Sequence, residues 1–122
     1  MFLLTLAVAV PAVAGDVRAI FGQLSTGRAA PVASYFDDHV LMAVDQVEEM
    51  LSESYATNIL QQFLDRGSNW RFTQIHSGHS VDGGRSFILG SLTGSTGSFR
   101  VYVLYRGGAN APVIQQLTVE RE

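Results

Sequence analysis

The second half of the chain consists of four strand-like segments separated by short turns, and this pattern limits the folds that the chain can adopt. The segments are residues 70–80, 85–94, 97–107 and 112–121. Glycine-rich turns join them, for example Gly94-Ser95-Thr96-Gly97. Spacers this short connect consecutive strands as hairpins. The pattern therefore predicts an antiparallel meander of four strands.

The start of the first half predicts two short helices. Apolar residues recur three and four apart from Val17 to Leu24, after Asp16 as a possible cap, and Gly27 follows as a typical helix end. A second short helix is expected over Pro31 to Phe36.

A turn at Asp37-Asp38 and a strand over His39 to Val44 are expected next, and the strand is apolar on both faces. A longer helix follows, capped by Ser52 or Ser54 and ending near Arg66-Gly67. Its apolar stripe comprises Tyr55, Ala56, Ile59, Leu60 and Phe63. Helices first and strands afterwards predict an α+β fold, with Trp70, Phe72, Ile59 and Phe63 in the core.

The first fourteen residues are typical of an export signal. Phe2 to Val10 is an apolar run with one threonine, and Ala12-Val13-Ala14 fits the small-residue pattern of a cleavage site. The run is too short to span a bilayer, which needs roughly 20 apolar residues. No basic residue precedes it, and a buried N-terminal helix or strand is the alternative. We therefore expect a signal peptide over 1–14, a single domain over 15–122, and a periplasmic or secreted protein.

Composition argues against several classes of function. The formal net charge is −3, and the eight basic residues are all arginines spread along the chain, so no basic stripe indicates nucleic-acid binding. The chain has no cysteine, so its core must hold the fold without disulfides. With three scattered histidines, neither a metal site nor a cofactor is expected.

Three stretches carry a resemblance to a known superfamily. These are "YFDDHVLM", "SYATNILQQFL" and the terminal meander, which contains "FTQIHSG" and "VIQQLTVE". Their order resembles the nuclear transport factor 2-like superfamily, also described as the cystatin-like cone fold. Within it, the chain looks most like a group of small exported bacterial proteins known only as a domain of unknown function. The resemblance implies three N-terminal helices packed in a strongly bent, mainly antiparallel sheet, with a pocket between them.

The same resemblance bears on catalysis. In ketosteroid-isomerase-like members the general base is an aspartate in the first long strand, and the matching position here is Ala43. Asp45 lies two residues further and either reaches the pocket mouth or starts the loop Asp45-Gln46-Val47. The neighbouring Asp37, Asp38 and His39 resemble an acid–base cluster, but a turn explains them better.

His76 is the second candidate catalytic residue. If Trp70 and Phe72 face the core, the alternation through Gln74 places His76 toward the pocket. There it either acts as a general base or is simply hydrogen-bonded near the bend before Gly78.

One segment offers a candidate surface for a ligand or a partner. Phe99, Val101, Val103 and Tyr105 share one face of a strand, and Arg100, Tyr102, Leu104 and Arg106 share the other. Arg100 beside Tyr102 either binds a carboxylate or forms a solvated face.

Two functions follow from these patterns. The first is an exported, non-catalytic module that binds a small apolar or amphipathic ligand or another protein, with a homodimer through the sheet expected. The alternative is a small acid–base enzyme, similar to isomerases or dehydratases, that uses His76 and Asp45. Because superfamily members include both kinds of protein, the fold alone does not decide between them.

Overall fold

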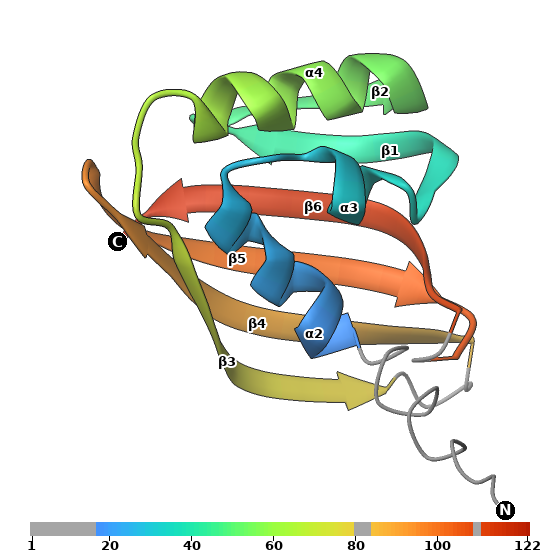
Figure 1. Ribbon diagram of the computed structural model, residues 1–122. Helices are drawn as coiled ribbons and strands as arrows, with labels where there is room; N and C mark the ends of the chain where they lie inside the picture. The colour runs from blue at the N-terminus through green and yellow to red at the C-terminus, as the bar shows by residue number, and fades with distance from the viewer. Residues whose placement is uncertain (1–16, 80–83, 109–110) are drawn as a thin grey trace, which may run out of the picture.

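The computed structural model describes residues 17–79, 84–108 and 111–122, so the predicted signal peptide and the Asp16 cap lie outside the described residues. The fold is α+β, as predicted. One six-stranded mixed sheet carries the helices on a single face, with strand order β2-β1-β6-β5-β4-β3 (Figure 1). We call the face that packs against the helices the inner face and the opposite one the outer face.

The first predicted helix is confirmed. It consists of α2 (Val17–Gly22) and the 3-10 helix η2 (Gln23–Thr26). Gly27 ends it in the left-handed conformation at φ 76°, and its N–H donates to the carbonyl of Leu24 at 2.9 Å. The second helix, α3 (Ala30–Ala33), is shorter than predicted.

The turn predicted at Asp37-Asp38 is wrong, because these residues and His39 belong to strand β1 (Phe36–Val44). The chain turns earlier, at Ser34 and Tyr35. The C-terminal strand β6 (Val113–Arg121) fixes this earlier start, since the Ile114 N–H donates to the Tyr35 carbonyl at 2.8 Å and Ile114 pairs with Phe36.

A strand that the sequence did not indicate, β2 (Val47–Ser52), forms a hairpin with β1. The predicted loop is only the two-residue turn Asp45-Gln46, with φ of 58° and 68°, and Val47 already pairs with Val44.

Helix α4 (Glu53–Leu64) follows, and Ser52 is its cap, accepting from the Tyr55 N–H at 3.4 Å. The buried stripe is Ala56, Leu60, Phe63 and Leu64, and Ile59 is partly buried against the core. Tyr55 was predicted on this stripe, but it lies in the first turn of the helix and is 66% exposed.

The predicted four-strand meander is confirmed. It consists of β3 (Arg71–His79), β4 (Arg85–Gly94), β5 (Gly97–Arg106) and β6, each antiparallel to the next. The pair β1–β6 is parallel, which makes the sheet mixed. The strong bend that we expected is not observed: the sheet twists but is not strongly curled (Figure 1). Among the described residues, the two α-helices before β1 contain only six and four residues, so they offer little surface for the sheet to wrap around.

The core lies between the helices and the inner face. Phe99, Val101, Val103 and Tyr105 point into it, which makes Arg100, Tyr102, Leu104 and Arg106 the outward set. Trp70 is 3% exposed, as expected for a core residue, and Phe72 packs against the cluster while partly exposed. The Trp70 indole N–H donates to the Leu64 carbonyl at 2.9 Å, so its polar atom is paired inside the core.

Candidate functional site

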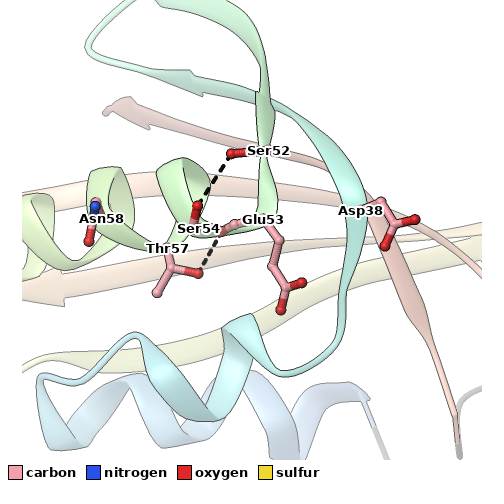
Figure 2. Close-up of a pocket in the computed structure, with 6 residues that line it drawn as sticks. All are labelled: Asp38, Ser52, Glu53, Ser54, Thr57 and Asn58. Carbon is pink, nitrogen blue, oxygen red and sulfur yellow. Dashed lines mark hydrogen bonds between the residues drawn. The ribbon is translucent and has the colours of Figure 1, made fainter.

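A polar hollow of about 580 Å³ opens at the start of α4 (Figure 2). Its lining residues are Asp38, Ser52, Glu53, Ser54, Thr57 and Asn58. The hydroxyls are engaged in holding the helix: Ser52 Oγ caps α4, and Thr57 Oγ1 donates to the Glu53 carbonyl at 2.7 Å. The two carboxylates would repel an anion from the helix N-terminus, so the hollow is best explained by helix capping.

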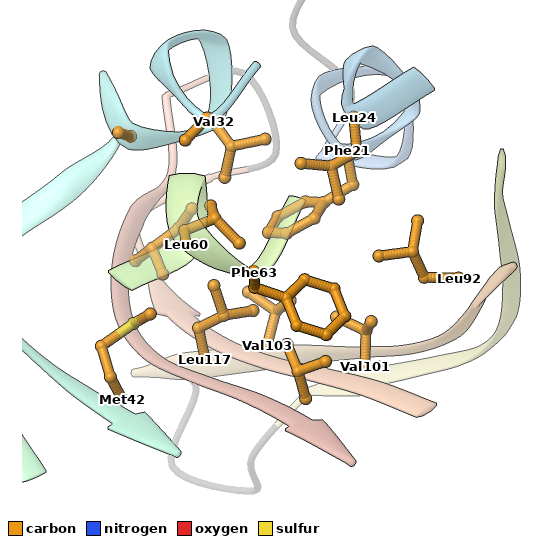
Figure 3. Close-up of a cluster of buried hydrophobic side chains, with 14 of the residues drawn as sticks. Phe21, Leu24, Val32, Met42, Leu60, Phe63, Leu92, Val101, Val103 and Leu117 are labelled. Carbon is orange, nitrogen blue, oxygen red and sulfur yellow. The ribbon is translucent and has the colours of Figure 1, made fainter. Parts of the chain in front are cut away.

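The space between helices and sheet, where the resemblance implied a pocket, is occupied by apolar side chains (Figure 3). Phe21, Leu24 and Phe63 enter it from the helices, and Leu92 and Val101 enter it from the sheet. Among the residues that the structure describes, none of the buried side chains is polar or charged. Catalytic acids and bases are typically tuned by burial or by a close charge, and this interior offers neither.

His76 lies on the outer face, contrary to the predicted facing. The pairing of β3 with β4 shifts between Gln74 and His76, so Ile75 is an extra residue that reverses the alternation. The imidazole of His76 is exposed and lies 5.6 Å from the ring of Phe87, measured between ring centroids. A β-bulge leaves no simple mark in a sequence, so alternation alone gave the wrong face.

Asp45 is a turn residue, the second of the two roles that the sequence left open. Its carboxylate accepts from Arg66 Nη1 at 2.6 Å, and both side chains are about half exposed, at 52% and 54%. Asp45 joins β1 to β2 at one edge of the sheet, whereas His76 lies on β3 at the opposite edge. The structure therefore does not bring the two candidate catalytic residues together.

The outer face carries a largely apolar band across the sheet, which Gln116 and Thr118 interrupt on β6. The strand registers align its side chains in two adjacent rows, which we call the outer band. One row is Met50, Leu41, Gln116, Leu104, Phe87 and Gly78, and the other is Glu48, Ala43, Thr118, Tyr102, Leu89 and His76. Most of these side chains are half-buried, and Met50 is 61% exposed.

Both candidate ligand-binding residues lie on this face, but with different surroundings. Tyr102 is part of the outer band and stacks on Phe87, with centroids 5.9 Å apart and an angle of 24° between the rings. Phe87 also reaches over Gly78, where a Cβ would lie only 2.6 Å from the ring. Arg100 lies beside the band and forms an exposed ion pair with Glu122 at 3.9 Å.

A groove of about 320 Å³ crosses one side of the outer band. It is lined by Asp37, His39, Leu41, Met50, Arg85, Leu104, Gln115 and Gln116. The Gln115 Oε1 atom is buried and has no hydrogen-bond partner among the described residues. The sequence indicated Tyr102 and Leu104 on β5, and a strand at His39 to Val44 that is apolar on both faces. It gave no indication of Met50 or Phe87, because their alignment depends on strand order and register.

Within residues 17–79, 84–108 and 111–122, no group of three or more His, Asp or Glu side chains is arranged to hold a metal ion. None of the helices in that part of the chain combines the length and apolarity needed to cross a membrane.

Comparison with known proteins gives one family match. Residues 17–120 match a domain of unknown function, DUF4783. A DUF4783 protein from Bacteroides uniformis is structurally similar, with a TM-score of 0.76 at 20% identity, covering 88% of this chain and 98% of that one. No curated protein matches the chain in sequence.

Two further structures relate the fold to the wider superfamily. A cystatin-like domain of unknown function from Nostoc punctiforme has a TM-score of 0.68 at 13% identity, over 96% of this chain and 80% of that one. A designed protein of the Rd1NTF2 series has a TM-score of 0.67 at 13% identity, over 84% and 92%. At these identities the likeness establishes the fold alone.

Proposed function

The chain belongs to the DUF4783 family, and from this premise we propose that it is a non-catalytic interaction module that pairs with a second copy of itself through the outer face of its sheet. The observation that carries the proposal is the outer band. It crosses all six strands, and in the described part of the chain the helices lie on the other face (Figure 1). Exposed surfaces rich in apolar side chains often mark an interface on soluble domains.

A second copy suits this surface because the charges around the band have both signs. Arg100 and Glu120 are cross-strand neighbours beside it, and Arg106 lies 3.8 Å from Asp37 on its other side. A two-fold axis along the strands, between β5 and β6, would place Glu120 of one copy opposite Arg100 of the other. The same axis would place Thr118 opposite Tyr102. Two-fold pairing is the commonest closed arrangement of soluble proteins.

The non-catalytic part of the proposal is supported by the interior and by the separated candidates. An acid–base enzyme needs its two groups within hydrogen-bond reach of one substrate. Here the interior is apolar, and His76 and Asp45 lie at opposite sheet edges. A protein-interaction surface requires only exposed side chains such as those of the outer band, and it requires no pocket.

The test is the molar mass in solution, measured by light scattering after size-exclusion chromatography at micromolar concentration. We expect a dimer for the unmodified protein and a monomer for Tyr102→Glu, because a carboxylate would be buried at the centre of the interface. Thr93→Glu is the matched control, since Thr93 is exposed on the same face outside the band, and it should remain dimeric. A monomeric mass for the unmodified protein would refute the proposal.

We also propose that the protein works outside the cytoplasm. The Ala12-Val13-Ala14 pattern after the apolar run from Phe2 to Val10 supports this. The intact mass of protein exported by a bacterial host should correspond to a chain that begins at Gly15. A soluble cytoplasmic product that retains Phe2 to Ala14 would contradict the export hypothesis.

A further inference from the structure

The edge of the sheet formed by β2 collects exposed apolar side chains. Val47 is 62% exposed, Met50 is 61% exposed, and Tyr55 in the adjoining first turn of α4 is 66% exposed. They are three of the four large apolar side chains that are exposed in the described residues. These side chains lie at the β2 edge, away from the centre of the outer band on β5 and β6. Met50 is also the end residue of one row of that band.

The backbone of β2 has N–H and C=O groups that can pair with another strand. Among the strands that the structure describes, β2 pairs only with β1, so its other side is an edge of the sheet. In a hairpin with a two-residue turn, the residues that flank the turn, here Val44 and Val47, form a hydrogen-bonded pair. Alternation then directs the N–H and C=O groups of Glu48 and Met50 away from β1, toward an incoming strand.

A small apolar groove lies beside this edge on the helix side. It has a volume of about 80 Å³ and is lined by Met42, Val44, Val47, Glu49, Leu51 and Ile59. A strand added to β2 would direct every second side chain to this side of the sheet. The groove is of a size to receive one aliphatic side chain from such a strand.

The negative charges of β2 favour a basic partner strand over a second copy of the chain. Glu48 and Glu49 are both exposed, one on each face of the strand, and Glu53 follows on α4. If two copies paired through β2, these carboxylates would approach each other, and like charges on neighbouring strands are destabilising. A partner with lysine or arginine at alternate positions would instead be attracted.

We propose that β2 binds, as a seventh strand, an extended segment of a partner protein in which apolar residues alternate with basic ones. The apolar side chains pack into the groove between β2 and α4, and the basic side chains lie beside Glu48 on the outer face. The backbone groups of Glu48 and Met50 supply the hydrogen bonds, as in other cases of strand addition to a sheet edge. The β2 edge shares Glu48 and Met50 with the outer band, but its hydrogen-bonding groups lie in the plane of the sheet, so this proposal does not rest on the dimer.

The experiment is an NMR titration of the full, isotope-labelled chain with a short capped peptide of alternating lysine and valine. We expect shifts centred on the amides of Glu48 and Met50. Met50→Pro removes an outward N–H without breaking the ladder to β1, and it should weaken binding roughly tenfold. Met50→Ala is the matched control, because it removes the same side chain and keeps the N–H, so it should bind much as the unmodified protein does.

A charge reversal keeps the test decisive if Met50→Pro does not fold. Glu48→Lys should lose affinity for the lysine peptide and gain affinity for a peptide of alternating glutamate and valine. Three results would overturn the proposal. The first is that the peptide causes no shifts of the β2 amides, and the second is that Met50→Pro and Met50→Ala weaken peptide binding equally. The third is that the unmodified protein binds the lysine peptide and the glutamate peptide with equal affinity. In the Tyr102→Glu background, where the outer-face dimer should be absent, concentration-dependent shifts of the β2 amides without peptide would assign the edge to a second copy and would also overturn the proposal.

Discussion

Replacing Gly94 with alanine tests how Trp70 packs against the sheet. A Cβ at this position would lie 2.5 Å from Trp70 Cε3 and 2.7 Å from Cζ3, closer than carbon atoms can approach. Gly94 is not among the glycines with positive φ, so alanine carries no backbone penalty there. The cost of Gly94→Ala should therefore come from the indole ring alone.

The ring has little freedom to move away. Its N–H is hydrogen-bonded to the Leu64 carbonyl, and its centroid lies 5.3 Å from Phe63 and 6.0 Å from Phe99. Overpacking of this kind costs roughly 1–3 kcal/mol of the free energy of unfolding. Trp70→Ala should cost about 3–5 kcal/mol, because a large buried aromatic is lost and its cavity closes only in part.

The two substitutions should be strongly coupled. Once the indole is removed, the methyl group that Gly94→Ala adds enters the vacated space, so this substitution should cost close to nothing in the Trp70→Ala background. The coupling free energy should be on the order of 1–3 kcal/mol, within the range known for residues in direct contact.

Urea denaturation of the four proteins of this double-mutant cycle measures the effect. Far-UV circular dichroism should follow unfolding, because Trp70 is the only tryptophan and fluorescence would be lost with it. Equal costs of Gly94→Ala in both backgrounds would show that the penalty comes from the backbone and not from the ring. A Trp70→Ala protein within about 1 kcal/mol of the unmodified one would show that Trp70 is not a core residue.

Two further predictions concern features near α4. Ser52→Ala should lower the free energy of unfolding by about 1 kcal/mol, because it removes the cap of α4. Ser54→Ala should lower it by much less. Thermal unfolding of both variants checks this, and an equal loss would mean that Ser52 is not the main cap. Arg66→Ala should cost less than about 1 kcal/mol, because its ion pair with Asp45 is half exposed, and a larger loss in chemical denaturation would mean that this pair anchors the β1–β2 turn.

The elements marked by periodicity and by glycine were predictable from the sequence. Gly27 marked the end of the first helix, and the short glycine-rich turns marked the meander, because both signals are local. Trp70 and Phe63 were recognised as core residues for the same reason, since each continues a regular apolar pattern.

The features that depend on contacts distant in sequence were not predictable. The turn Asp45-Gln46 has positive φ at two residues that are not glycine, so it lacked the usual hairpin signal and β2 was overlooked. The bulge at Ile75 reversed the facing of His76, and the outer band became apparent only from strand order and register. Each of these depends on how strands pair, which a single sequence does not specify.

The parallel pairing of β1 with β6 has a consequence for how the chain acquires its structure. The paired residues, such as Leu41 with Gln116, lie about 75 positions apart, and among the described strands β6 alone joins the β1–β2 hairpin to the rest of the sheet. Closing so long a loop costs entropy before any contact repays it, and such contacts slow folding. We expect the meander of β3, β4 and β5 to form early from local hairpins, while the β1–β2 hairpin and α4 dock only after the last strand is in place. During synthesis, the β1–β2 hairpin and α4 would then remain undocked until β6 has been made.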